Sequence, residues 1–139
     1  MAYENTEVPV ARSQEAIRKL VMGNNGTGVM FWSKPPREGF EAFIPLDGVS
    51  YHVRIQAEVK KSRKDKDGEA STRRIWRVLF YHMKSVYENA NSGVMEFREM
   101  MLPYIVTSDG MTIAEKLIPH LAKAIESRPE RLLAAGKDE

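Results

Sequence analysis

The stretch GFEAFIPLDGVSYHVRIQAEV, residues 39–59, decides the fold of this chain. Two runs of alternating apolar residues flank Asp47-Gly48, a dipeptide favoured in two-residue hairpin turns because both of its residues tolerate positive φ. With this turn, the cross-strand pairs are Glu41–Arg54, Phe43–His52 and Phe40–Ile55. An ion pair and an apolar pair both fall in register, so we expect an antiparallel hairpin.

The second strand of this hairpin has one apolar and one polar face, because side chains alternate between the two faces of a strand. The apolar face carries Val49, Tyr51, Val53, Ile55, Ala57 and Val59. The polar face carries Ser50, His52, Arg54, Gln56 and Glu58. The sequence therefore predicts an antiparallel sheet with one covered face and one polar face.

The segments before the hairpin predict a helix and a further strand. Residues 13–22 have apolar residues at helical spacing, with Ser13 as the expected N-cap. Residues 28–33 form an apolar strand candidate. Pro35-Pro36 places a loop after it, since proline cannot donate to a β-ladder.

Helices are expected after the hairpin. Ser71 or Thr72 caps a long helix that ends at residues 89–93, and residues 94–102 form a second, short helix. The wide apolar arc of the long helix should lie across the sheet.

A capping box marks the start of the last helix. Thr112 is followed at the required spacing by Glu115, and a break is expected at Pro119 because proline disrupts a helix interior. The expected fold is α+β, a three-stranded antiparallel sheet covered by helices in the order α-β-β-β-α-α-α.

The chain has 139 residues, enough for one domain with a sizeable core. We expect a single domain over residues 13–126, a flexible segment over 1–12 and a loosely held tail over 127–139. The absence of cysteine excludes disulfides, thiolate nucleophiles and cysteine-ligated metals. The sequence has neither an apolar run of about 20 residues nor a secretory-type start, so we expect a cytoplasmic protein away from membranes.

Positive charge is concentrated in one stretch, KKSRKDKDGEASTRRIWR at residues 60–77. It holds eight of the 21 Lys and Arg residues but three of the 19 Asp and Glu residues. The formal net charge of the chain is only +2, so the remainder is net acidic. Such clustering indicates a surface for an anionic partner.

We predict that this stretch contacts nucleic-acid phosphates, of DNA in preference to RNA. Guanidinium and ammonium groups suit phosphate oxygens, and the N–H groups at a helix N-terminus also favour anions. The predicted contact residues are Lys60, Lys61, Arg63, Lys64, Lys66, Arg73, Arg74 and Arg77, extended by Arg54 on the polar sheet face. An exposed Trp76 would stack on a base; the competing interpretation places it in the core.

Other interpretations remain open. The stretch can equally be a hydrated loop whose mixed charge serves solubility, or it can contact a protein. The alternative function is a protein–protein adaptor or inhibitor of a host or phage factor, acting through an apolar patch around Phe31, Trp32 and Phe43. Met100 and Met101 are candidates for a homo-oligomer contact.

No catalytic or cofactor-binding motif stands out. His52, His82 and His120 lie on a strand and two helices without metal-ligand spacing, and His82 is expected to be a hydrogen-bonded core residue. An enzyme would need Glu41, Glu58 and His52 around one cleft. We therefore expect no metal, no cofactor and no catalysis.

From Trp76 onward the residues follow a familiar order. They are Trp76-Arg77, Leu79, Lys84, Glu88, Gly93, Phe97, Glu99, Asp109-Gly110, Thr112, Glu115, Leu117 and Pro119. With SQEAIRKLV before the sheet, this pattern resembles a family of small proteins of actinobacterial phages and prophages, over roughly residues 12–133. The resemblance implies a phage accessory protein of early DNA metabolism, with no catalytic residue or cofactor to carry over. The loop after the third strand is shorter and richer in lysine than that family's pattern.

Overall fold

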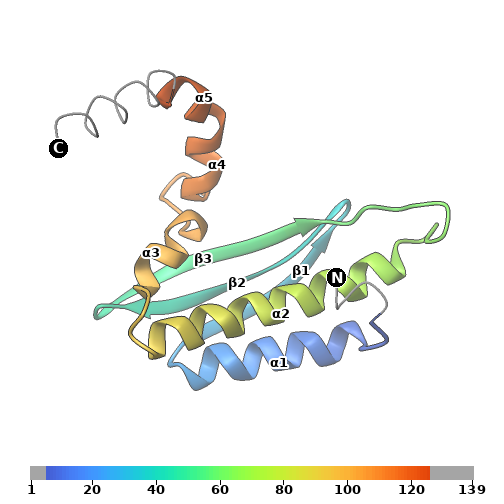
Figure 1. The fold of residues 1–139 in the computed structure, drawn as a ribbon, viewed down its shortest axis with the longest axis horizontal. Helices are drawn as coiled ribbons and strands as arrows, with labels where there is room; N and C mark the ends of the chain where they lie inside the picture. The colour runs from blue at the N-terminus through green and yellow to red at the C-terminus, as the bar shows by residue number, and fades with distance from the viewer. Residues whose placement is uncertain (1–5, 126–139) are drawn as a thin grey trace, which may run out of the picture.

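The computed structural model describes residues 6–125 and has the expected α+β architecture (Figure 1). Its helices and strands are α1 (Val10–Gly23), β1 (Thr27–Lys34), β2 (Arg37–Leu46), β3 (Val49–Glu58), α2 (Glu69–Asn91), α3 (Phe97–Met101), α4 (Ile113–Leu117) and α5 (Leu121–Ala124). The 3₁₀ turns Leu102–Tyr104 and Ile118–His120 follow α3 and α4. The sheet is antiparallel, in the order β1-β2-β3.

The Asp47-Gly48 turn sets the register of β2 and β3, as predicted. Asp47 and Gly48 have φ angles of 51° and 83°, the positive values that this kind of turn requires. The predicted pairs Glu41–Arg54, Phe43–His52 and Phe40–Ile55 are all present. Pro35-Pro36 forms the other hairpin turn, between β1 and β2.

The hydrophobic core lies between one face of the sheet and helices α1 and α2, which run side by side across it (Figure 1). Its largest fully buried side chains are Trp76, Phe40, Ile17, Ile44, Met83, Met101, Val21 and Val53. Phe31 of β1 packs edge-on against Trp76, with ring centroids 5.6 Å apart. Each large apolar side chain contributes about 1.5–3 kcal/mol on burial, so this core holds the helices on the sheet.

Helix α1 begins at Val10, with Pro9 as its N-cap, so the prediction that Ser13 caps it was wrong. Ser13 lies fully buried inside the helix, and its hydroxyl accepts hydrogen bonds from the guanidinium of Arg77. A buried hydroxyl requires such a partner, and here α2 supplies it. Residues 10–12, predicted to be part of a flexible segment, belong to this helix.

Helix α2 begins at Glu69, ahead of both predicted caps. Its N-cap is Gly68, whose φ of 77° is a left-handed conformation that glycine adopts without strain. The Ser71 hydroxyl instead accepts the backbone N–H of Lys60 at 3.3 Å, and the Thr72 hydroxyl donates to the Gly68 carbonyl at 2.7 Å. Both hydroxyls therefore tie the helix to the loop before it.

The segment after α2 is less helical than predicted. Helix α3 covers only residues 97–101 of the expected 94–102 and ends in a 3₁₀ turn containing Pro103. Met101 is fully buried in the core, which excludes the oligomer contact predicted for it. Ile105 then forms an isolated antiparallel bridge with Val53 at the edge of β3.

The predicted capping box starts α4. Thr112 and Glu115 each accept the other's backbone N–H, both at 3.1 Å. The helix breaks at Pro119, as predicted, into α4, a 3₁₀ turn and α5. Figure 1 shows α4 and α5 on the side of the sheet opposite the two long helices. The predicted tail, 127–139, lies outside the described residues.

Between residues 6 and 125 the structure contains no helix with the length and apolar character that a membrane span requires.

Candidate nucleic-acid interface

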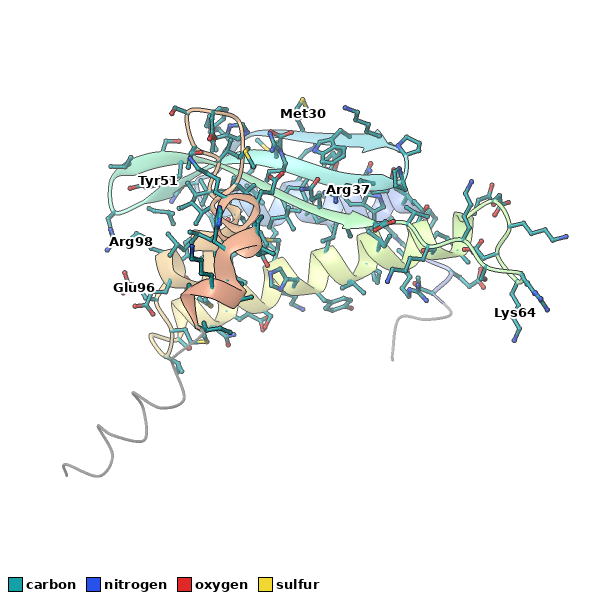
Figure 2. All side chains as sticks on the ribbon, turned by 90° about the horizontal axis from the view of Figure 1, so that it is seen from above. Met30, Arg37, Tyr51, Lys64, Glu96 and Arg98 are labelled. Atoms are coloured by element: carbon teal, nitrogen blue, oxygen red, sulfur yellow. The ribbon has the colours of Figure 1, made fainter. Side chains whose placement is uncertain are left out.

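The loop between β3 and α2, residues 59–68, extends from one end of the molecule. Figure 2 shows Lys64 at its tip, pointing into open space. At its base, the Val59 N–H donates to the Pro36 carbonyl at 2.7 Å. Near its tip, Ser62 and Asp65 exchange backbone hydrogen bonds of 3.2 and 3.1 Å, so the loop is tied to the β1–β2 turn at its base and closed by its own backbone near its tip.

The carboxylates of this loop face the start of α2. Asp65 accepts the backbone N–H groups of Ala70 at 3.1 Å and Ser71 at 2.8 Å, and Asp67 accepts that of Glu69 at 3.0 Å. The hydrogen bond from Ser71 is the main reason that the pKa of Asp65 lies below its usual value. The helix N–H groups that were expected to attract a phosphate are therefore already bound by the protein's own carboxylates.

The cations of the loop face solvent. Lys60, Lys61, Arg63, Lys64 and Lys66 are all exposed. Within residues 6–125, none of them lies within 4.0 Å of a carboxylate oxygen. Asp65 and Asp67 are thus turned towards the helix N–H groups, and the loop presents cations without a carboxylate in ion-pair contact.

Arg74 joins this surface from the second turn of α2. It lines a crevice of about 290 Å³ together with Lys60 and Lys61 at the base of the loop. The other lining residues are Ser62, Asp65, Ala70 and Ser71. Arg74 is the arginine of α2 that lies beside the loop cations.

Arg73 and Arg77 are bound to the N-terminal part of the chain. Arg73 donates to the Thr6 carbonyl at 3.4 Å. Arg77 donates to the Ser13 hydroxyl at 3.1 and 3.0 Å, and its guanidinium lies 4.9 Å from the centre of the Phe80 ring. Both arginines are therefore engaged within the chain, Arg77 by joining α1 to α2, and we leave both out of the proposed contact surface.

Arg54 does not extend the basic surface as predicted. It lies on the face of the sheet opposite α1 and α2, where its guanidinium is 3.4 Å from Glu41 and 3.6 Å from Glu115 and donates to the Gly110 carbonyl at 2.9 Å. The His52 ring lies 2.7 Å from the same Glu41 carboxylate. The protein's own acceptors therefore engage Arg54, which is not free to contact a phosphate.

Trp76 is fully buried and cannot stack on a base, so the core interpretation is correct. Its indole Nε1–H donates to Glu38 at 3.1 Å. Sequence reasoning missed Glu38 as an interior residue, although the hairpin register places it opposite Ala57, on the same face as Phe40. The alternation of side chains along β2 was therefore the signal in the sequence that could have placed Glu38 in the interior.

The predicted apolar patch is divided between the two faces of the sheet. Phe31 points into the core against Trp76, whereas Trp32 and Phe43 lie on the opposite face. Neighbouring residues of a strand point to opposite faces, so Phe31 and Trp32 cannot share one surface patch.

The histidines are dispersed, and residues 6–125 contain no group of three His, Asp or Glu side chains that could hold a metal ion. His82 is exposed, which corrects the expectation of a core residue, and lies 3.3 Å from the Tyr104 hydroxyl. Partial desolvation lowers the pKa of His82. His120 is exposed, as expected.

Comparisons of the chain with protein-family models, with curated proteins and with solved structures find no match in any of the three.

Proposed function

We propose that this chain binds the phosphate backbone of nucleic acid through the loop between β3 and α2, without catalysis. The contact residues are Lys60, Lys61, Arg63, Lys64, Lys66 and Arg74. One observation carries the proposal: the loop's carboxylates cap the helix while its cations are exposed and, in the described part of the chain, without a carboxylate partner. A cation that no carboxylate neutralises can replace the counterions of a phosphate.

The proposal includes a biological setting. DNA is the preferred nucleic acid, and the chain is an accessory protein of a phage that acts in the cytoplasm of the infected cell. This part rests on the pattern that runs from Trp76 to Pro119.

Salt dependence tests the proposal. If the loop contacts about four phosphates, the dissociation constant for duplex DNA should rise roughly 100-fold between about 50 and 200 mM salt, because bound counterions are released. Fluorescence anisotropy with labelled single- and double-stranded DNA and RNA measures this change. Failure to bind any of these at the lower salt concentration would refute the proposal.

Charge-matched variants locate the contact. Arg63→Gln with Lys64→Gln removes two charges at the loop tip, and Lys19→Gln with Lys123→Gln removes two exposed charges on α1 and α5. Only the loop pair is expected to weaken binding, by about tenfold or more, and to reduce the salt dependence. An equal effect of both pairs would mean that net charge alone drives association.

A protein partner is the second candidate. Met30 and Phe43 lie on the sheet face opposite the two long helices and are 54% and 45% exposed. Methionine and aromatic side chains are enriched at protein interfaces. This candidate includes self-association, which the exposed apolar side chains between the end of α4 and residue 125 favour. They are Leu117, Ile118, Leu121 and Ile125. The affinity of a complex held by such apolar contacts would not fall with added salt. Phe43→Ser would weaken a complex formed on the sheet face.

A further inference from the structure

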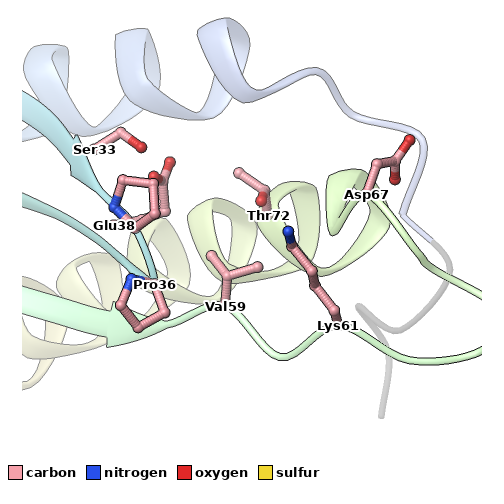
Figure 3. Close-up of a pocket in the computed structure, with 8 residues that line it drawn as sticks. Ser33, Pro36, Glu38, Val59, Lys61, Asp67 and Thr72 are labelled. Atoms are coloured by element: carbon pink, nitrogen blue, oxygen red, sulfur yellow. The ribbon is translucent and has the colours of Figure 1, made fainter.

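A pocket of about 700 Å³ lies beside the basic loop, where the β1–β2 turn, the start of the loop and the first turn of α2 meet (Figure 3). Its lining residues are Ser33, Pro35, Pro36, Glu38, Val59, Lys61, Asp67 and Thr72. The volume falls in the range of about 300–1,000 Å³ that is common for small-molecule sites. The pocket shares Lys61 with the proposed phosphate-binding surface.

Glu38 provides a buried acceptor in this pocket. Glu38 is only 8% exposed, and one of its carboxylate oxygens accepts the Trp76 indole N–H at 3.1 Å. Within residues 6–125 this is its one hydrogen bond to the protein, although a carboxylate has about four acceptor positions. Because a buried carboxylate without donors is costly, a ligand with N–H groups would be favoured there.

The other polar groups of the pocket are spread from the Glu38 end to the opposite end. Figure 3 shows Ser33 and Glu38 at one end, Asp67 at the other, and the Lys61 ammonium pointing towards Thr72 between them. Thr72 and Asp67 are already hydrogen-bonded, Thr72 to the Gly68 carbonyl and Asp67 to a backbone N–H. The apolar side chains of Val59 and Pro36 complete the wall.

Charge restricts the ligand that this pocket accepts. The Lys61 ammonium and the neighbouring loop cations oppose a cationic group, whereas the Glu38 carboxylate opposes an anionic group at the floor. A neutral, planar group with N–H donors, carried on an anionic chain, satisfies both conditions. An unpaired base of a nucleic-acid strand has this chemistry.

We propose that the pocket takes one unpaired base of a bound strand and that Glu38 makes the pocket selective for guanine. Guanine presents two adjacent donors, N1–H and the N2 amino group, on its Watson–Crick edge, and a carboxylate accepts both. Adenine and cytosine present one amino group there, and thymine presents one N3–H. This inference rests on the proposed function, because the phosphates beside the base are held by the basic loop.

Single-stranded oligonucleotides that differ at one position test the selectivity. Thymine oligonucleotides of about 12 nucleotides with one central guanine, adenine or cytosine have the same backbone charge. We expect the guanine oligonucleotide to bind about tenfold more tightly than the others, the discrimination typical of a paired hydrogen-bond contact. Anisotropy competition against a labelled all-thymine strand measures the ratio.

Glu38→Gln assigns the selectivity to the carboxylate. The amide oxygen of glutamine still accepts the Trp76 N–H. Its NH₂ group, however, is a donor and cannot accept a hydrogen bond from the N–H groups of guanine. The guanine preference should disappear, while binding to the other three oligonucleotides stays within about twofold of the wild type. Thermal unfolding of the variant checks that it remains folded.

A second measurement uses mononucleotides, so it tests the pocket separately from the contact between the loop and a nucleic-acid strand. The Trp76 indole N–H signal in an ¹H–¹⁵N spectrum should shift with millimolar guanosine monophosphate and not with cytidine or uridine monophosphate; Trp32→Phe assigns the signal. Salt-dependent binding of all oligonucleotides alike would overturn the guanine inference and leave the proposed function standing. No binding of any oligonucleotide would overturn the proposed function, and an unmoved indole signal would overturn the pocket assignment.

Discussion

Glu38 and Trp76 form a buried hydrogen bond between a sheet residue and the centre of α2. Trp32, on the opposite sheet face, differs because its indole N–H is buried without a hydrogen-bond partner in the described part of the chain. Its ring lies over Gly39, where an added Cβ would come 2.6 Å from the ring. The two tryptophans thus have similar chemistry but opposite hydrogen-bonding states.

Replacing each tryptophan by phenylalanine should separate these states. Trp76→Phe leaves Glu38 without its donor and opens a cavity in the core, so it should lower the free energy of unfolding by about 2–4 kcal/mol. Trp32→Phe removes a donor that has no partner and should cost about 1 kcal/mol, from lost apolar contact. Urea denaturation measures both values. Equal losses would show that the Trp76–Glu38 hydrogen bond contributes nothing.

Among the secondary-structure elements, α2 depends most on residues outside its own range. Asp65 lies before the helix yet accepts two of its first N–H groups, and the Ser62–Asp65 pair holds Asp65 in place. The hydroxyl residues at the start of the helix are engaged elsewhere. The loop and the first turn of α2 are therefore one structural unit.

Asp65→Ala should destabilise the protein in a pH-dependent way. The pKa of Asp65 is lowered in the folded protein from its usual value of 3.8, so ionised Asp65 stabilises the fold above that pH, and this contribution is lost as the pH falls through the lower, folded-state pKa. The melting temperature of the variant should thus be lower than that of the wild type at neutral pH, and the two should converge as the pH falls below 3.8. A difference that persists in acid would mean that the carboxylate charge is not the cause.

The hairpin and the start of α4 could be predicted from sequence, whereas the starts of α1 and α2 could not. The Asp47-Gly48 turn and the alternation on both sides are local, so they determine the pairing without knowledge of the rest of the fold. Ser13 and Ser71 match the local signature of a cap, but the Ser13 hydroxyl bonds Arg77 on α2 and the Ser71 hydroxyl bonds Lys60 at the base of the preceding loop. Tertiary contacts of this kind leave no local pattern.

Across the whole molecule, the basic residues fall into two groups that the sequence does not distinguish. The loop cations and Arg74 are at one end of the molecule, whereas Arg54 and Arg77 take part in internal contacts. The hairpin register already pairs Arg54 with Glu41, but the contact with Glu115 brings together β3 and α4 and could not be foreseen. The sequence therefore grouped cations that the structure divides between the loop and contacts within the fold.

Substitutions of Arg74 and Arg77, three residues apart on α2, should have separate effects on nucleic-acid binding and on stability. Arg77→Gln loses two hydrogen bonds to Ser13 and the contact with Phe80, and should lower the free energy of unfolding by about 1–2 kcal/mol without changing nucleic-acid affinity. Arg74→Gln should weaken binding several-fold while changing stability by less than about 0.5 kcal/mol. Urea denaturation and anisotropy on both variants provide the comparison. If Arg77→Gln weakens binding as much as Arg74→Gln does, the division into two groups is wrong.

The mutual backbone bonds of Ser62 and Asp65 enclose Arg63 and Lys64. Extra residues inserted between Arg63 and Lys64 would lengthen the tip of the loop. Asp65 would keep its place at the start of α2. The same insertion between Asp65 and Gly68 would displace the carboxylate from the helix. Related chains can therefore diversify the reach and charge of the tip by insertion at one point, while the sheet and its helices stay constant.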